Sequence, residues 1–100
     1  MNPIYKMQNG VYVDLDKIVA VSNVEAYNCN YHFGVAFQLC QQTINMFLSD
    51  DQDEICRNKF LYGETGTEYN DEAYCKAQII TLNAIREDLI NKWDEFKNGQ

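Results

Sequence analysis

The feature that most constrains the fold is a long helical pattern in the last third of the sequence. Asn70 is a residue type that caps helices, and it predicts a helix that runs from 71 to about 97. Such a helix is about 40 Å long at a rise of about 1.5 Å per residue. A domain of 100 residues has a radius of gyration of roughly 13 Å. We therefore expect part of this helix to pack on something besides its own sheet.

Apolar residues recur along this helix at alternating spacings of four and three, which indicates one continuous seam. The seam comprises Cys75, Ile79, Leu82, Arg86, Leu89, Trp93 and Phe96. Arg86 stands where the period requires an apolar side chain. One interpretation is that its stem packs while its guanidinium reaches Glu87, Asp88 or a carboxylate of a neighbouring chain. The other is an anion site, because an arginine forms bidentate hydrogen bonds with phosphate.

The first half of the sequence has the pattern of an antiparallel sheet. Asn9-Gly10, between two apolar runs, is the strongest turn signal of the chain and predicts a hairpin with a type I′ turn. Further β-rich runs follow at 18–26, 33–39 and 43–48. We expect four to five strands over 1–48.

At position 49 the pattern changes from strands to helices. Residues 49–52 read Ser-Asp-Asp-Gln, which has the form of a capping box with acids in the first turn, and they predict a short helix from 49 to about 62. The stretch 63–70 contains two glycines and is expected to be a connector, with Gly63 in a helix C′ position. The fold class is therefore α+β, in one domain over 1–100.

Charge and hydropathy restrict the partners. Eight basic and 15 acidic residues give a net charge of -7, which argues against a surface that tracks duplex nucleic acid or an anionic membrane. The 46% of hydrophobic residues is typical of a folded soluble chain. No apolar run is long enough for a membrane span, and the first residues lack the pattern of a secretory signal. We expect a cytoplasmic protein.

The cysteines and the single histidine do not form a metal-binding pattern. Cys29, Cys40, Cys56 and Cys75 are widely spaced, without a C-x-x-C pair. We therefore expect the cysteines to be buried, reduced thiols and to bind no metal. His32 stands near a strand start and is expected to be a surface or edge residue.

The sequence carries none of the common catalytic motifs, such as a P-loop or a G-x-S-x-G elbow, so we expect no enzyme and no cofactor. Binding remains, because four aromatic residues bracket the connector: Phe60, Tyr62, Tyr69 and Tyr74. In one interpretation, Phe60 and Tyr74 belong to the core, and Tyr62 and Tyr69 are partly exposed. In a second interpretation, the four aromatic residues form a purine-binding site beside Asn70 and Arg86.

The layout and three positions resemble the phage-encoded Thoeris anti-defence sponges, which sequester cyclic ADP-ribose isomers made by a bacterial immune sensor. Members are similar to this chain in having an antiparallel sheet, a short helix, a connector and a longer helix. Phe60, Asn70 and Arg86 stand in the order and near the spacing of the family's ligand contacts. By this likeness Phe60 stacks on the base, Asn70 hydrogen-bonds the ligand and Arg86 meets the diphosphate. Members carry a second basic residue one turn after the arginine, where this chain has Ile90.

The resemblance implies a homodimer with the nucleotide pocket between protomers, and in some members three dimers assemble as a hexamer. It implies that a cyclic ADP-ribose isomer is held without cleavage in the infected bacterial cell. Two alternatives stay open. One is an acidic inhibitor that imitates nucleic acid and occupies a basic groove of a partner protein. The other is an oligomeric structural protein without ligand, in which Arg86 makes an interchain ion pair.

Overall fold

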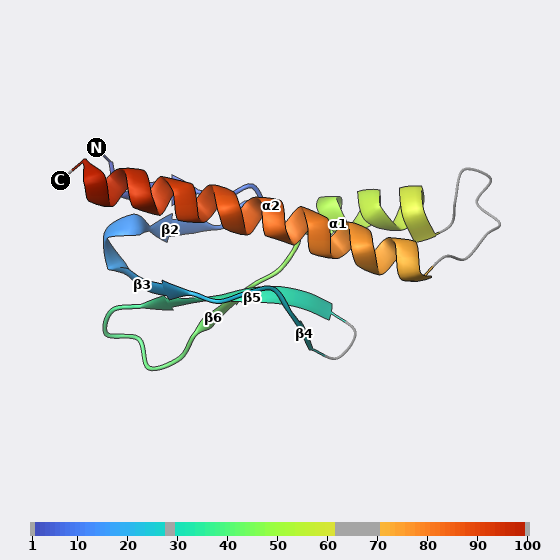
Figure 1. Ribbon diagram of the computed structural model, residues 1–100, viewed down its shortest axis with the longest axis horizontal. Coiled ribbons are helices and arrows are strands. Elements are labelled where there is room, and N and C mark those ends of the chain that lie inside the picture. Colours follow the sequence, from blue (N-terminus) through green and yellow to red (C-terminus); the bar gives the residue numbers. More distant parts are fainter. Residues whose placement is uncertain (1, 28–29, 62–70, 100) are drawn as a thin grey trace.

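The computed structural model describes residues 2–27, 30–61 and 71–99. It confirms the α+β class: antiparallel strands are followed by α1 (Asp50–Cys56), a π-helical turn η2 (Arg57–Leu61) and α2 (Asp71–Asn98). Figure 1 shows α2 extending along the strands, with α1 beside its N-terminal half. The radius of gyration is 15.4 Å, larger than expected, because α2 alone has 28 residues. The connector predicted at 63–70 lies outside the described residues.

The strands form two antiparallel sheets. β1 (Ile4–Lys6) pairs with β2 (Tyr12–Asp14), and a 3-10 turn η1 (Leu15–Lys17) leads on to the larger sheet. That sheet contains β3 (Ile18–Val21), β4 (Glu25–Tyr27), β5 (Asn30–Phe37) and β6 (Ile44–Met46). β5 is central, because Val35 pairs with Val21 of β3 on one side and with Ile44 of β6 on the other. β4 pairs with the first three residues of β5.

The turn between β1 and β2 is not the predicted type I′ turn. Gly10 has a φ of +90°, but Asn9 lacks the positive φ that a type I′ turn also requires. The Gly10 N–H donates to the Met7 carbonyl at 2.9 Å, and the Met7 N–H donates to the Val11 carbonyl at 2.8 Å. These bonds fit a three-residue loop with a left-handed glycine. The buried Asn9 side chain instead donates through Nδ2 to the Phe47 carbonyl at 2.9 Å.

The hydrophobic core lies between α2 and the strands. α2 contributes Leu82, Ile85, Leu89 and Phe96, and the strands and their turns contribute Met7, Val13, Leu15, Ile18, Phe33, Val35 and Met46. Fully burying one such side chain stabilises the fold by about 1.5–3 kcal/mol. The contacts of α2 with β5, η1 and β3 therefore fix its position on the sheet.

The predicted seam on α2 is wrong in phase at its centre. Ile85 is 1% exposed and fills the core, whereas Arg86 lies at the border of the core and is partly exposed. Leu82 and Leu89 are fully buried, as the seam predicted. An amphipathic helix has an apolar stripe more than about 100° wide, so both position 85 and position 86 fall within reach of the core. The apolar side chain, Ile85, is the one that packs in the core.

The predicted capping box at the start of α1 is confirmed. The Gln52 N–H donates to Ser49 Oγ at 3.2 Å, and the Ser49 N–H donates to Gln52 Oε1 at 3.0 Å. The Gln52 side chain also donates to the Gln8 carbonyl at 3.2 Å, which ties α1 to the β1–β2 loop. The α-helix ends at Cys56, and the predicted helical stretch continues as η2.

Two predictions for the cysteines and the histidine are wrong. Cys56 is buried as expected, but Cys40 is exposed, and Cys29 lies outside the described residues. His32 is 8% exposed on the central strand instead of lying at the surface, and its ring centroid is 5.5 Å from that of Phe47. Side chains alternate along a strand, so His32 faces away from the α2 side and the Phe47 ring helps to cover it.

Within the described ranges, no three His, Cys, Asp or Glu side chains come together as a metal-binding group. None of the helices in the described part of the chain is long and apolar enough to cross a membrane.

Truncation of α2 tests whether its packing supports the fold. We expect Leu82→Ala to lower the free energy of unfolding by about 2–5 kcal/mol, because it leaves a cavity in the core. Ile80→Ala is the matched control on the same helix, since Ile80 is 69% exposed, and we expect a change within about 0.5 kcal/mol. Urea denaturation measures both. Equal effects of the two substitutions would contradict this packing.

Candidate functional site

Arg86 reaches from α2 to the interrupted edge of the larger sheet. Its Nε donates to the Ser22 carbonyl at 2.6 Å. Ser22 follows the last residue of β3, and residues 22–24 separate β3 from β4. The interruption of the strand gives the side chain on α2 a backbone carbonyl to bind, and this bond fixes the position of the guanidinium.

Ser22 is itself held on the central strand. Its N–H donates to the Gly34 carbonyl at 2.8 Å, and its Oγ accepts from the Gly34 N–H at 2.7 Å. A Cβ on Gly34 would overlap Cγ2 of Thr43 and would also lie 3.3 Å from Ser22 Oγ. This close approach requires a glycine at position 34. The acceptor of Arg86 is therefore fixed to β5.

The intrachain carboxylate partners proposed for Arg86 do not bind it. Asp88 accepts a hydrogen bond from the Tyr5 hydroxyl, and Glu87 is exposed. Among the described residues, no carboxylate forms an ion pair with Arg86. The interpretation of an ion pair with Glu87 or Asp88 is therefore wrong, and a carboxylate of a neighbouring chain remains the structural alternative.

Most of the other basic side chains bind a carboxylate or lie over an aromatic ring, whereas Arg86 does neither among the described residues. Four of them pair with carboxylates: Lys17 with Asp16, Arg57 with Asp53, Lys76 with Glu72 and Lys92 with Glu95. Two lie over aromatic rings: Lys6 over Tyr12 and Lys97 over Trp93. A guanidinium has five N–H donors, and Ser22 takes one from Arg86. Within the described part of the chain, Arg86 is thus a partly buried cation held by a neutral carbonyl.

The structure places only one of the three predicted ligand contacts. Phe60 belongs to η2, but its side chain lies outside the described residues, as does the whole of Asn70. Tyr62 and Tyr69 also lie outside them. Tyr74 is described, and it is a partly buried residue with a polar contact instead of a core residue.

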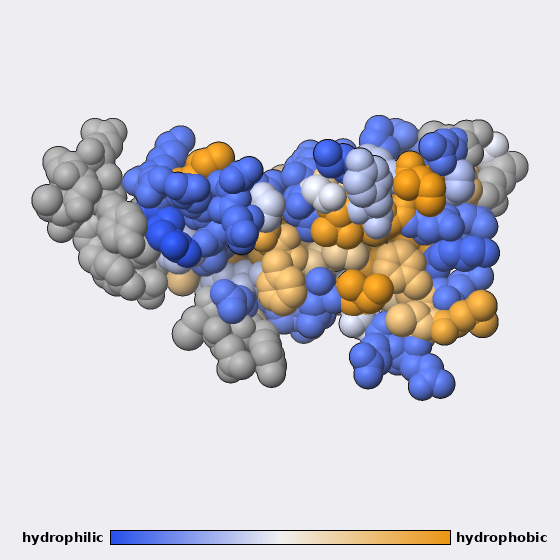
Figure 2. Space-filling view, turned by 180° about the vertical axis from the view of Figure 1, so that it is seen from behind, coloured by the Kyte–Doolittle hydropathy of each residue, from blue (hydrophilic) through white to orange (hydrophobic). Residues whose placement is uncertain are grey.

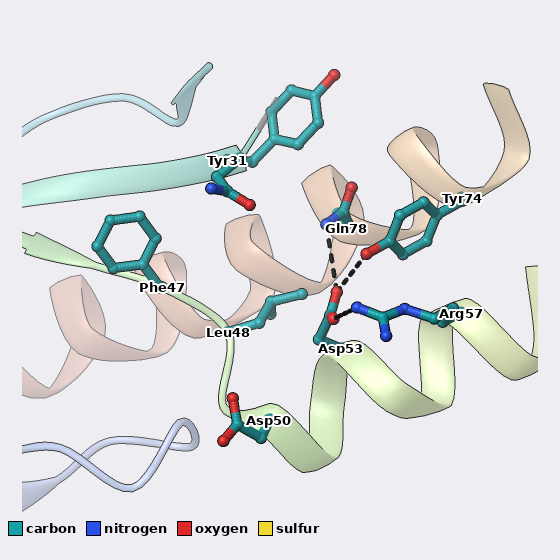
Figure 3. Close-up of a pocket in the computed structure, with 9 residues that line it drawn as sticks. Tyr31, Phe47, Leu48, Asp50, Asp53, Arg57, Tyr74 and Gln78 are labelled. Atoms are coloured by element: carbon teal, nitrogen blue, oxygen red, sulfur yellow. Dashed lines mark hydrogen bonds and ion pairs between the residues drawn. The ribbon is translucent and has the colours of Figure 1, made fainter. Parts of the chain in front are cut away.

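A cavity of about 190 Å³ lies between the sheet and the two helices (Figure 3), and sequence reasoning did not predict it. We call it the helix–sheet cavity. Its lining consists of Asn30, Tyr31, Phe47 and Leu48 from the strand side and Asp50, Asp53, Arg57, Tyr74 and Gln78 from α1, η2 and α2. The exposed surface of this lining is mostly polar, and the helices supply its charged side chains.

Asp53 organises the polar side of the helix–sheet cavity. Its Oδ1 accepts from the Tyr74 hydroxyl at 2.5 Å and from Gln78 Nε2 at 3.4 Å, and its Oδ2 accepts from Arg57 Nη2 at 2.6 Å (Figure 3). Burial, and then the bond to the Asp53 carboxylate, raise the pKa of Tyr74. Both pairs, Asp53 with Arg57 and Tyr74 with Gln78, have the i,i+4 spacing of one helix face. That spacing is the sequence signal that could have indicated the polar side of the cavity.

The chain matches no family model, no curated protein and no solved structure.

The bond between Tyr5 and Asp88 has a pH signature. Burial, together with the Asp88 carboxylate, raises the pKa of Tyr5 to about 12. In the unfolded chain the value is about 10, so the unfolded state releases this proton first. We expect the stability of the parent relative to Tyr5→Phe to be constant below pH 10 and to fall between pH 10 and 12. Urea denaturation midpoints of the two proteins at each pH measure this difference in stability. A difference that stays constant from pH 10 to 12 would contradict a hydrogen bond between Tyr5 and Asp88.

Proposed function

We propose that the protein binds a cyclic ADP-ribose-type nucleotide and holds it without cleaving it, and that this capture blocks Thoeris immunity in the infected bacterial cell. The proposed ligand residues are Phe60, Asn70 and Arg86, as the resemblance to phage anti-defence sponges implies. Such a protein needs tight binding and no chemical step. Its requirements are a cation for the diphosphate, a ring for the base and polar groups for the sugars.

The state of Arg86 is the observation that carries this proposal. A partly buried guanidinium without a carboxylate partner among the described residues gains more from an anion than an exposed cation does, because water screens it less. The net charge of -7 disfavours anions over most of the surface. A phosphate is therefore drawn to a local, pre-positioned donor group, and the bond to Ser22 supplies that positioning.

A homodimer, and a hexamer of three dimers, are part of the proposal. Arg86 keeps part of its surface exposed, so a second protomer could close the pocket over it. Figure 2 shows apolar patches between hydrophilic surfaces on the face that it presents.

Titration calorimetry with cyclic ADP-ribose isomers tests the proposal. We expect the parent to bind one isomer with a submicromolar Kd and to return it intact on denaturation. Arg86→Ala should lose about 2 kcal/mol or more of binding free energy, on the order of thirtyfold in Kd. Arg86→Lys should be intermediate, because it keeps the charge but loses the planar fork. Lys76→Ala, which removes an exposed ion pair with Glu72, is the control and should bind like the parent.

Linear ADP-ribose and cyclic dinucleotides are the comparison ligands. An absence of heat and of any rise in Tm with all of these nucleotides would overturn the proposal, because a ligand specific to the folded state must raise its stability. Unchanged binding by Arg86→Ala would remove Arg86 from the site. Salt-sensitive binding to a basic protein, or a dimer with Arg86 in an interchain ion pair and no ligand, would favour the two alternative functions.

A further inference from the structure

The middle of the sequence carries no acidic residue, lysine or arginine. All eight basic and 15 acidic residues lie in 1–25 or 50–100, so the stretch 26–49 contains none of them. This stretch includes β5, β6 and the loop between them. Because the chain has a net charge of -7, most of its surface repels a second copy. A surface formed by 26–49 brings no like charges together and offers a charged partner no opposite charge to bind.

β6 is an unprotected edge strand of the larger sheet. It pairs with β5 on one side, and no strand of the described residues pairs with its other side. Proteins usually protect such an edge with a charged residue, a proline or a bulge. The residues at 43–48 read Thr-Ile-Asn-Met-Phe-Leu, and β6 follows β5 without a shift of register. None of the usual protections is present, so the edge is open to pairing with another strand.

The hydrogen bonds of neighbouring residues show which backbone groups of β6 face the free edge. Gly34, which lies opposite Asn45, directs both its N–H and its carbonyl to Ser22 on the other side of β5. Phe47, two residues after Asn45, directs its carbonyl to the side chain of Asn9 and not to β5. Opposite residues of an antiparallel pair alternate between bonded and non-bonded. The N–H and the carbonyl of Asn45 therefore both point away from β5.

We propose that β6 pairs with β6 of a second copy of this chain, antiparallel and about a two-fold axis at Asn45. Each Asn45 donates to and accepts from the other, which joins the two larger sheets into one. This register sets Ile44 opposite Met46 of the second copy on one face, and Thr43 opposite Phe47 on the other. Ile44 is 48% exposed and Phe47 is 44% exposed, and covering this apolar surface favours the contact.

The inference goes beyond the proposed function and does not rest on it. Arg86 binds the Ser22 carbonyl on the β3 side of β5, and β6 lies on the opposite side. The β6 contact is therefore distinct from a contact that closes over Arg86, and it forms without nucleotide. A two-fold contact of this kind is complete with two copies, so it yields a closed pair and not a fibre.

Charge substitutions at Asn45 test the contact, because the two Asn45 side chains face each other across the axis. In light scattering we expect the parent to self-associate. Asn45→Asp and Asn45→Lys should each raise the Kd of self-association about tenfold or more, since each sets like charges opposite each other. An equimolar mixture of the two variants should associate like the parent, because opposite charges then meet. Asn58→Asp adds the same charge at an exposed position of η2 and is the control that should associate like the parent.

A monomeric parent would overturn the inference without any variant. Self-association that Asn45→Asp leaves unchanged would also overturn it, as would a mixture that does not regain the association of the parent. Asn45 is exposed, so both variants should keep the urea denaturation midpoint of the monomer, which shows that they fold. Nucleotide capture by a chain that does not pair through β6 would refute this inference alone. Pairing through β6 without capture of a cyclic ADP-ribose isomer would refute the proposed function alone.

Discussion

The packing of α2 against β5 is the constraint on which the rest of the structure depends. Leu82, Ile85 and Leu89 are fully or almost fully buried in the core that Phe33 and Val35 of β5 also form. Because these contacts hold α2 along the sheet, it carries polar side chains to two separate places. Arg86 reaches the interruption between β3 and β4, and eight residues earlier, about 12 Å along the helix axis, Gln78 borders the helix–sheet cavity.

Local signals predicted much of the fold. The capping box at Ser49 and the helix from 71 depend on neighbouring residues alone, and the structure confirms both. The phase of the seam depends on the surface against which the helix packs, and there Ile85 instead of Arg86 faces the core. The prediction that His32 lies at the surface was wrong because it, too, depends on long-range packing. Its burial follows from β5 being the central strand, and a strand's position within a sheet is a long-range property.

The candidate site was only partly predictable. Arg86 was conspicuous as a cation in an apolar pattern, but its acceptor, the Ser22 carbonyl, is distant in sequence and is exposed by a break in a strand. The helix–sheet cavity requires three elements to converge, and the separate i,i+4 pairs on α1 and α2 do not show that the helices face each other. The roles of Phe60 and Asn70 stay predictions that rest on the resemblance.

The central claim is that Arg86, positioned by Ser22, is an anion site. The chain has two arginines, so Arg57, which pairs with Asp53, is an internal reference. The most direct measurement is the proton–nitrogen NMR spectrum of the two arginine Nε–H groups as a cyclic ADP-ribose isomer is added. We predict that the Arg86 signal shifts in proportion to bound ligand while the Arg57 signal stays in place. Nucleotide binding that leaves the Arg86 signal unmoved would contradict it.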